Sequence, residues 1–475
     1  MRCIVFACQG ILLIDPGSAS TLVPHSDVCV PPFSMIFPFC GVLLSISLLP
    51  LLLPKFWHNW ENYLLFGWSL FSIAMFYSFA GFDCAVASFL GVFFHEYMPF
   101  IVLLVTLYTI SCGLHLRLQT KITPTKNVLF LVIGSLMSSF IGTTGAAMLL
   151  LRPFILLNRH RVYQVHNIIF FTFVIANVGG CLTPLGDPPL FLGYLNGIDF
   201  FWPLKYLFIP CLIICGPLLG FYWCLDWFLM RKERSRTNQS QSEQTQNHTR
   251  SGSAIALDGG INLVLLFCVI ACLVGTGFIP ESPALQLFGL PITLNQLIRD
   301  GGLLTLALIS YKITPEKIHT QQNFSWTPMT EVARVFAAIF ITMLPINLML
   351  QAGQNGPLAA VLELTNSPHE AFVYFWLTGI FSSFLDNAPT YLLFFKMAGG
   401  DAADLMNNHH QTLVAISMGS VLMGAMTYIG NAPNFMIRSI AKQNNIKMPT
   451  FLGYMGWSCS ILLPLFLGAS LWLFW

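Results

Sequence analysis

The sequence SSFIGTTG at residues 138–145 returns as SSFLDNAP at residues 382–389, and TPLGDPPLF at residues 183–191 returns as TYIGNAPNF at residues 427–435. Each pair is separated by 244 positions. All of these stretches interrupt hydrophobic runs with Gly, Pro, Asp or Asn. Because two different motifs share one offset, the chain is predicted to hold two copies of one structural unit.

The composition places the chain in a membrane. Of its 475 residues, 55% are hydrophobic and only 9% are charged, which leaves too little polar surface for a soluble protein of this size. The apolar runs reach about 17 to 25 residues, the length that crosses a hydrocarbon core of ~30 Å as a helix. We therefore predict an all-α integral membrane protein.

Each half is predicted to follow one plan of spanning helices, a re-entrant hairpin and a discontinuous helix. The first half has helices at 33–53, 63–82, 97–116 and 203–230, a hairpin at 127–158 and a broken helix at 165–196. The second half has helices at 261–278, 296–313, 332–350 and 451–475, a hairpin at 371–398 and a broken helix at 411–440. Each arm of the hairpin at 127–158 holds about thirteen residues, too few to cross at 1.5 Å per residue. The total is about ten crossings plus two hairpins, with five crossings per unit, so the two repeats have inverted topology.

The predicted domains follow from this plan. They are an N-terminal leader at 1–32, a first transmembrane repeat at 33–230, a cytoplasmic linker at 231–258 and a second, inverted transmembrane repeat at 259–475. The leader has a short apolar stretch that fits either a cleaved signal or an irregular segment. The linker is polar and low in complexity, so we expect a flexible tether.

The placement of basic residues supports one orientation. With the linker in the cytoplasm, all but four of the 22 Lys and Arg residues fall on that side, as the positive-inside bias requires. The exceptions are Arg2, Lys205, Arg299 and Lys396. We expect a multi-pass protein of the cell (inner) membrane with both termini on the non-cytoplasmic side.

The interruptions are the predicted site. Unwound backbone at membrane depth is tolerated where it is buried in protein or lines a wet cavity, and paired interruptions mark the binding site of a transporter. The candidate ion-binding or substrate-binding residues are Thr143, Thr144, Asn177, Thr183, Asp187, Asp386, Asn387, Thr390, Thr427 and Asn431, with Asn434 as a weaker candidate. Among them, Asp386, Asn387 and Asp187 are the expected sodium ligands.

Asp386 is the first choice among these residues. A carboxylate at mid-membrane depth costs roughly 2.5–3.5 kcal/mol, so it is kept neutral, paired with a cation, or both in alternation. The alternative is that Asp386 caps the half-helix that begins near Ala388, since Asp is a favoured N-cap. Asp187 is the second choice, and its mate in the other half is Asn431; its alternative role is a turn-forming Asp before a proline.

Other polar residues have simpler interpretations. The 13 cysteines are scattered in apolar runs without zinc-ligand spacing, so we expect packing roles and no cofactor, with sodium only as a transported or coupling ion. His95, His115 and His166 lie at predicted helix ends and are expected to be interfacial rather than proton relays.

At these motifs the chain resembles the ion-transporter superfamily, which includes sodium/proton antiporters, citrate and dicarboxylate carriers and arsenite permeases. LDNAPT at 385–390 is similar to the second-hairpin motif of the antiporter and arsenite branches, and NVGG at 177–180 with TPLGDPP at 183–189 is similar to their first broken-helix motif. The resemblance covers residues 33–475. It implies inverted repeats, a site between hairpin tips and broken helices, an elevator-like motion and a homodimer.

The tips depart from the dicarboxylate branch, which carries Ser-Asn-Thr at both. This chain has GTT at 142–144 and DNA at 386–388, which favours cation exchange over a carboxylate substrate. The leading hypothesis is a sodium/proton antiporter, and the alternative is a sodium- or proton-coupled carrier of citrate or another organic anion. A channel or a membrane enzyme fits less well, because no acid/base or metal-ligand pattern supports an enzyme. The expected partners are small inorganic ions, a carboxylate such as citrate and the lipid bilayer, with no nucleic acid.

The antiporter hypothesis predicts the effect of replacing Asp386. Asp386→Asn removes the charge that proton and sodium share, so sodium-dependent proton flux is lost. Flux in proteoliposomes that is unaffected by this substitution would remove Asp386 as the shared group.

Overall fold

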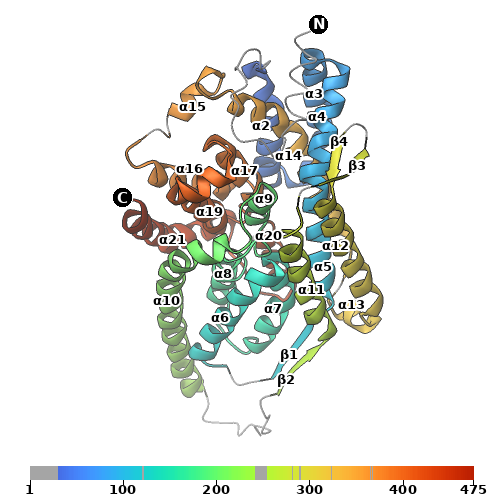
Figure 1. Cartoon of the computed structure of the whole chain (residues 1–475). Coiled ribbons are helices and arrows are strands. Elements are labelled where there is room, and N and C mark those ends of the chain that lie inside the picture. Colours follow the sequence, from blue (N-terminus) through green and yellow to red (C-terminus); the bar gives the residue numbers. More distant parts are fainter. Residues whose placement is uncertain are drawn as a thin grey trace.

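The computed structural model describes residues 30–119, 122–240, 254–280, 282–287, 290–322, 324–363, 365 and 367–475, and these residues are mostly helical (Figure 1). Seven of the described helices are long and apolar enough to cross a membrane. They are Phe33–Pro50, Pro54–Ala80, Phe82–Cys112, Pro124–Ile141, Trp202–Ser235, Thr327–Gln351 and Phe451–Phe474. The prediction of a mostly helical, multi-pass membrane protein is confirmed.

The elements of the first half alternate long helices with short ones. In chain order they are η1 (Phe33–Ile36), α2 (Phe37–Leu52), α3 (Pro54–Ala80), α4 (Phe82–Val92), the π-turn η2 (Phe93–Tyr97), α5 (Met98–Cys112), β1 (His115–Gln119), α6 (Pro124–Ile141), α7 (Thr143–Leu157), α8 (Val165–Val174), η3 (Val178–Gly180), α9 (Pro188–Leu195) and α10 (Trp202–Ser240).

The second half continues in the same manner. Its elements are β2 (Ala254–Asp258), α11 (Ile261–Thr276), β3 (Pro283–Leu287), β4 (Leu290–Thr293), α12 (Leu294–Ile313), α13 (Glu316–Gln322), α14 (Thr327–Gln351), η4 (Gly353–Asn355), α15 (Ala359–Glu363), α16 (Glu370–Phe384), α17 (Asn387–Met397), α18 (Ala402–Asn407), α19 (His410–Met423), η5 (Gly424–Met426), α20 (Ala432–Gln443) and α21 (Phe451–Phe474).

Two short strand pairs lie outside the all-α prediction. β1 pairs antiparallel with β2, and β3 pairs antiparallel with β4. The β1–β2 pair carries an ion pair between Arg117 Nη2 and Asp258 Oδ2 at 2.8 Å. The predicted tether of residues 231–258 is therefore wrong at both ends, because α10 continues to Ser240 and β2 occupies Ala254–Asp258. The predicted leader lies almost entirely outside the described residues.

The two predicted hairpins correspond to two helix pairs, α6 with α7 and α16 with α17. α6 and α7 have 18 and 15 residues, more than the thirteen or so expected for each arm of the first hairpin. α16 and α17 have 15 and 11 residues. α6 begins at the N-cap Thr123 and ends at Gly142, whose φ of +80° is accessible mainly to glycine. In Figure 1, α6 and α7 lie in the lower half of the molecule, and α16 and α17 lie in the upper half.

The broken helices lie where the sequence places them. α8 ends at Val174 and the chain becomes helical again, as α9, at Pro188; α19 ends at Met423 and α20 begins at Ala432. Proline in the first turn starts α9 and α20, because it has no amide hydrogen to leave unpaired there. The helix predicted at 97–116 instead begins at Phe82, as α4, η2 and α5 form one continuous apolar helix.

Each hairpin is hydrogen-bonded to the broken helix of its own half. Ser139 Oγ donates to the Gly179 carbonyl at 2.6 Å, and Thr183 Oγ1 donates back to the Ser139 carbonyl. Thr427 Oγ1 donates to the Ser383 carbonyl at 2.5 Å, which is the same bond 244 positions later. The duplicated motifs therefore make equivalent local contacts.

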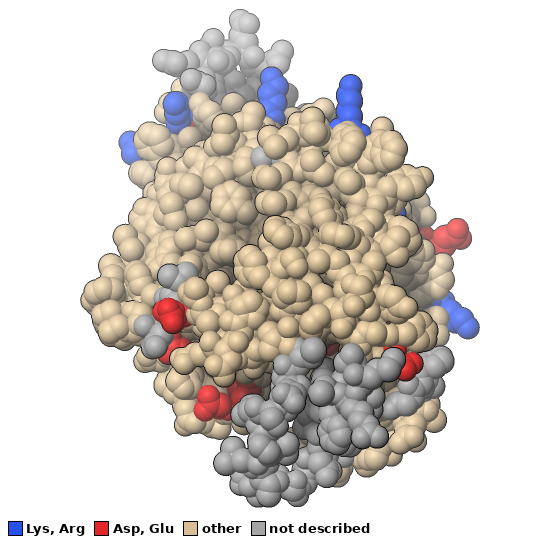
Figure 2. Space-filling model, turned by 90° about the horizontal axis from the view of Figure 1, so that it is seen from above, with Lys and Arg blue, Asp and Glu red and all other residues tan. Residues whose placement is uncertain are grey.

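The outer surface suits a lipid environment. Large apolar side chains such as Phe66, Phe267 and Leu452 are 68%, 75% and 76% exposed. The view from above in Figure 2 is dominated by uncharged residues, with Lys, Arg, Asp and Glu toward its edges.

Gly430→Ala is expected to destabilise the protein. A Cβ there would lie 2.7, 2.8 and 2.9 Å from the carbonyl oxygens of Gly424, Ser382 and Ser383, and overpacking typically costs about 1–3 kcal/mol. Thermal denaturation followed by size-exclusion chromatography should give a lower Tm than wild type. The control is Gly468→Ala in α21, where nothing lies within 4 Å of the added Cβ; equal melting of the two variants would contradict the close approach.

Candidate functional site

The Asp187 carboxylate lies where the two hairpin tips meet a break. Its Oδ1 accepts a hydrogen bond from Thr143 Oγ1 at 2.9 Å, and its Oδ2 accepts one from Asn387 Nδ2. Thr143 begins the return arm of the first hairpin, and Asn387 begins that of the second. Asp187 is only 1% exposed. One buried carboxylate thus joins both halves of the chain.

Glycines allow the tip of the first hairpin to lie close to the break that contains Asp187. The Thr143 amide donates to the Gly186 carbonyl at 2.8 Å, which fixes the tip against the break. A Cβ on Gly180 would lie 2.7 Å from Thr143 Cγ2 and 3.0 Å from Asp187 Cβ. Only glycine fits at Gly180 without moving the tip or the carboxylate.

Amide side chains join the two breaks. Asn177 Nδ2 donates to Asn434 Oδ1 at 2.9 Å, and Asn431 Nδ2 donates to Asn177 Oδ1 at 3.1 Å and to the Ala176 carbonyl at 3.0 Å. Asn434 Nδ2 donates to the Gly424 carbonyl at 2.8 Å. All of these side chains are buried. They donate to backbone carbonyls that have no helical partner at the breaks. They also form hydrogen bonds between the two halves of the chain near Asp187.

The predicted threonines divide into separate roles. Thr183 and Thr427 donate their hydroxyls to hairpin carbonyls, so they hold the breaks rather than the carboxylate. Thr390 donates to the backbone of its own helix at 2.9 Å. Thr144 is half-buried and makes no hydrogen bond to Asp187 among the described residues. Thr143 alone of the predicted threonines contacts the carboxylate.

Asp386 caps α17. Its Oδ1 accepts a hydrogen bond from the Ala388 amide at 3.2 Å, and its side chain is half-buried. The capping alternative is confirmed, while an ion-binding role stays a prediction. Asp386 immediately precedes Asn387, whose side chain contacts Asp187, so two acidic residues lie at this junction. The carboxylate that is hydrogen-bonded to both hairpin tips is that of Asp187.

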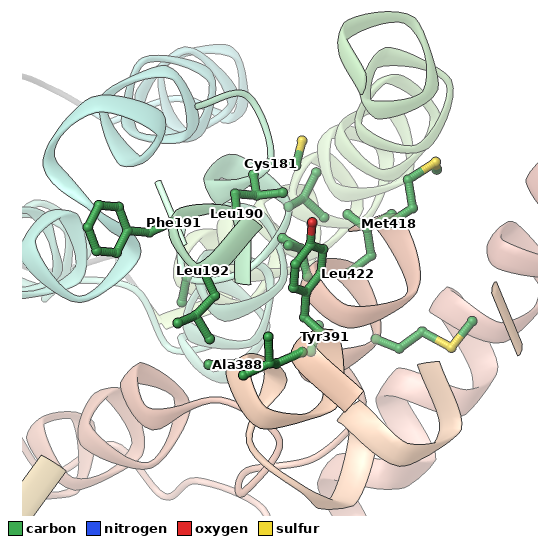
Figure 3. Close-up of a cluster of buried hydrophobic side chains, with 14 of the residues drawn as sticks. Cys181, Leu190, Phe191, Leu192, Ala388, Tyr391, Met418 and Leu422 are labelled. Carbon is green, nitrogen blue, oxygen red and sulfur yellow. The ribbon is translucent and has the colours of Figure 1, made fainter. Parts of the chain in front are cut away.

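An apolar cluster lies next to the junction. Figure 3 shows side chains of α9 against those of α17 and α19, with Tyr391 between them. The labelled residues are Cys181, Leu190, Phe191, Leu192, Ala388, Tyr391, Met418 and Leu422, and all are buried. Leu190 is three positions after Asp187 and Ala388 follows Asn387, so the cluster adjoins the carboxylate. Excluding water there strengthens electrostatic interactions within the site.

The donor set suits a hard cation. The carboxylate has only hydroxyl and amide hydrogen-bond partners, and the buried Asn387 Oδ1 has no hydrogen-bond donor within the described residues. Carboxylate, hydroxyl and amide oxygens are the ligands that hard cations prefer. Over the same residues, no group of three or more His, Cys, Asp or Glu is arranged to hold a metal ion. The arrangement places one carboxylate beside uncharged hydroxyl and amide groups in a buried position.

Two acidic residues are more central in the structure than the sequence predicts. From the sequence, Asp187 is the second choice after Asp386. The equivalent position in the other half is Asn431, so this turn can form without a carboxylate, and that was a signal for a further role of Asp187. Asp226 was missed, and the signal was an acid inside the apolar run predicted at 203–230. It is 0% exposed and hydrogen-bonds His166.

Thr143→Val is expected to destabilise the junction. It leaves the buried carboxylate one donor short, which typically costs about 1–3 kcal/mol. Thermal melting of the purified protein should show a clear decrease in Tm, and the decrease should shrink when Asp187→Asn is also present. The matched control is Thr144→Val, which should melt like wild type; a larger loss there would show that the contact is not the cause.

A search of curated proteins finds no match. A family model described as "Putative citrate transport" matches residues 30–475, which is nearly the whole chain. The chain belongs to this citrate-transport family.

Proposed function

We propose that this secondary transporter exchanges sodium for protons at Asp187. The observation that carries the proposal is the buried carboxylate held between both hairpin tips by uncharged donors. The sequence hypothesis of antiport is kept, but the shared group moves from Asp386 to Asp187.

The energetics favour alternation at such a carboxylate. A charged side chain at mid-membrane depth costs roughly 2.5–3.5 kcal/mol, so it is neutralised by a proton or balanced by a cation. Proton and sodium then compete for one group, which is the minimum requirement for antiport. Thr143 Oγ1, Asn387 Oδ1 and Asn431 supply uncharged groups beside it, with Asp386 as a second acid.

A second candidate is cation-coupled carriage of citrate or another organic anion. The family description favours it. α7 and α17 also begin at the junction, and helix N-termini present backbone amides and a positive dipole end to anions. In this case sodium or a proton at Asp187 would be the coupling ion, and the anion would be held by the helix starts.

The transport unit we propose is built from two inverted repeats. The equivalent Thr183 and Thr427 hydrogen bonds and the opposite placement of the two helix pairs in Figure 1 support it. Both breaks and both tips would move together against α3, α5, α12 and α14 in an elevator-like motion. A homodimer in the cell (inner) membrane, with both termini on the non-cytoplasmic side, completes the proposal.

Proteoliposomes with an internal pH dye test the two candidates. Sodium or lithium is added outside, and citrate is added afterwards. We expect proton release on sodium addition without citrate, its loss in Asp187→Asn, and a smaller decrease in Asp386→Asn, because Asn can still cap α17. Asp83→Asn, at an exposed acid in the first turn of α4, should behave like wild type.

Two outcomes would change the proposal. If no proton flux occurs until citrate is present, and radiolabelled citrate uptake follows a sodium or proton gradient, the protein is an anion carrier. Normal sodium-driven flux in Asp187→Asn would sink the assignment of the site, and a larger loss in Asp386→Asn would return the main role to that residue.

A further inference from the structure

A cavity of about 190 Å³ lies between α2, α3 and α14, which pack together in the upper part of the molecule (Figure 1). Its polar lining is Glu61 and Asn62 of α3 and Glu331 and Arg334 of α14, with the Trp57 ring beside them, and the rest of the lining is apolar. Pockets for drug-sized ligands hold ~300–1,000 Å³, so this cavity suits a smaller group. We name it the α3–α14 pocket.

The pocket lies at one end of its three helices. It uses the last two turns of α2 and the first three turns of α3 and α14. α3 and α14 have 27 and 25 residues, so they are about 40 and 37 Å long and exceed a hydrocarbon core of ~30 Å. Glu61 lies about 10 Å from the start of α3, and Glu331 lies about 6 Å from the start of α14. The charged lining is therefore near the boundary between hydrocarbon and lipid headgroups.

Aromatic side chains on the neighbouring face of α3 agree with this depth. Phe56, Trp60 and Tyr63 are 42%, 52% and 70% exposed, and their ring centroids follow one another at 6.2 and 5.5 Å. Exposed aromatic residues gather at the level of the headgroups, because their rings have an apolar body and a polar edge. The side chains of Glu331 and Arg334 belong to exposed residues, so the pocket opens at this level.

The charged groups of the pocket are not paired with one another. Among the described residues, no ion pair of 4.0 Å or less involves Glu61, Glu331 or Arg334, and neither carboxylate accepts a hydrogen bond. Arg334 donates from Nη1 to Asn62 Oδ1 and from Nε to the Thr330 carbonyl at 3.1 Å, and its Nη2 donates to no acceptor in this part of the chain.

A buried charged cluster elsewhere in the chain shows the opposite arrangement. Asp226 Oδ1 lies 2.9 Å from Arg161 Nη1 and 2.9 Å from His166 Nε2, and the three side chains are 0%, 7% and 2% exposed. The protein there supplies partners for its own charges, and the interfacial role expected for His166 is wrong. In the α3–α14 pocket, hydrogen-bond partners for the charged groups come from outside the chain.

The arrangement of charges suits a zwitterion. Two carboxylates accept strong hydrogen bonds from an ammonium group, and an indole ring such as that of Trp57 attracts a cation. The guanidinium of Arg334 matches a phosphate. A choline headgroup has no N–H to donate to the carboxylates, and a glycerol headgroup carries no cation. A primary ammonium joined to a phosphate satisfies both kinds of group.

A divalent cation is a poorer match for the pocket. Over the described residues, no group of three or more His, Cys, Asp or Glu is arranged to hold a metal ion. The guanidinium of Arg334 lines the same cavity as the two carboxylates, and it repels a second cation there.

The apolar part of the pocket favours a lipid over a soluble amine phosphate. Ile46, Leu65 and Val335 line the same cavity as the charged groups. Leu52 and Leu53, at the end of α2, are 66% and 53% exposed. A headgroup in the pocket can therefore continue into acyl chains along an apolar surface.

We propose that the α3–α14 pocket binds the headgroup of a phosphatidylethanolamine lipid, with the ammonium group at Glu61 and Glu331 and the phosphate at Arg334. The bound lipid joins the starts of α3 and α14 and so stabilises the contact between these helices. Binding at this pocket is independent of the identity of the transported ion.

Lipid binding to purified, delipidated full-length protein tests this site. Native mass spectrometry measures the affinities of phosphatidylethanolamine, phosphatidylcholine and phosphatidylglycerol with the same acyl chains, and thermal melting is followed in parallel. We expect wild type to bind phosphatidylethanolamine at least about tenfold more tightly than phosphatidylcholine, with an increase in Tm. Free phosphoethanolamine is included as the soluble form of the same headgroup.

The two halves of the pocket should respond differently to substitution. The double variant Glu61→Gln/Glu331→Gln should lose the preference for phosphatidylethanolamine over phosphatidylcholine. Arg334→Gln should weaken all three lipids at least about fivefold, because each carries a phosphate. The matched controls are Glu316→Gln in α13 and Lys312→Gln at the end of α12, both at exposed residues, and they should bind like wild type.

Four results would overturn the lipid site. They are equal binding of phosphatidylethanolamine and phosphatidylcholine by wild type, a double variant that keeps the wild-type preference, binding of free phosphoethanolamine without binding of the lipid, and displacement of the lipid by calcium in wild type but not in the double variant. A double variant that changes oligomeric state but not lipid binding would instead make the pocket a contact between two copies of the chain. If the double variant does not fold, Glu331→Gln and Arg334→Gln carry the same comparison.

Discussion

Backbone that leaves a helix inside a membrane must find hydrogen-bond partners in the protein, because lipid offers none and each unpaired group costs several kcal/mol. In this chain the two hairpin tips and the two helix breaks face that requirement at the same place. Ser139 and Thr183 meet it in the first half, and Ser383 and Thr427 meet it in the second. Polar residues at the interruptions are thus needed by the fold before any ligand binds.

The same constraint explains the composition of the site. Once hydroxyls and amides have satisfied the backbone, a few polar groups remain directed inward, and Asp187 is the carboxylate that both tips contact. The apolar cluster of α9, α17 and α19 lies beside it and keeps water from screening its charge (Figure 3). Because Thr143 and Asn387 come from different halves, the site exists only when the halves meet.

The two halves have kept some features of their common plan and lost others. Gly180 and Gly186 correspond to Gly424 and Gly430, and each pair lets the chain pass close to itself within a break. The outer ends have diverged, since the charged cluster around Asp226 has a neutral counterpart at Ser470. The two halves therefore share the glycines within the breaks, where the backbone passes close to itself. They differ around Asp226 and Ser470, where the contacts are made by side chains.

The sequence by itself determined the mostly helical membrane class, the positions of the two duplicated helix pairs and of the breaks, and the set of polar residues at them. It did so because hydrophobic run length and Gly, Pro and Asn interruptions act locally along the chain. It did not show the strand pairs, the continuation of α10 to Ser240 or the length of α6, since these depend on what neighbouring segments offer. Only the tertiary structure decided that Asp386 caps a helix while Asp187 joins the tips, because which carboxylate meets which donor depends on contacts 44 and 200 residues apart.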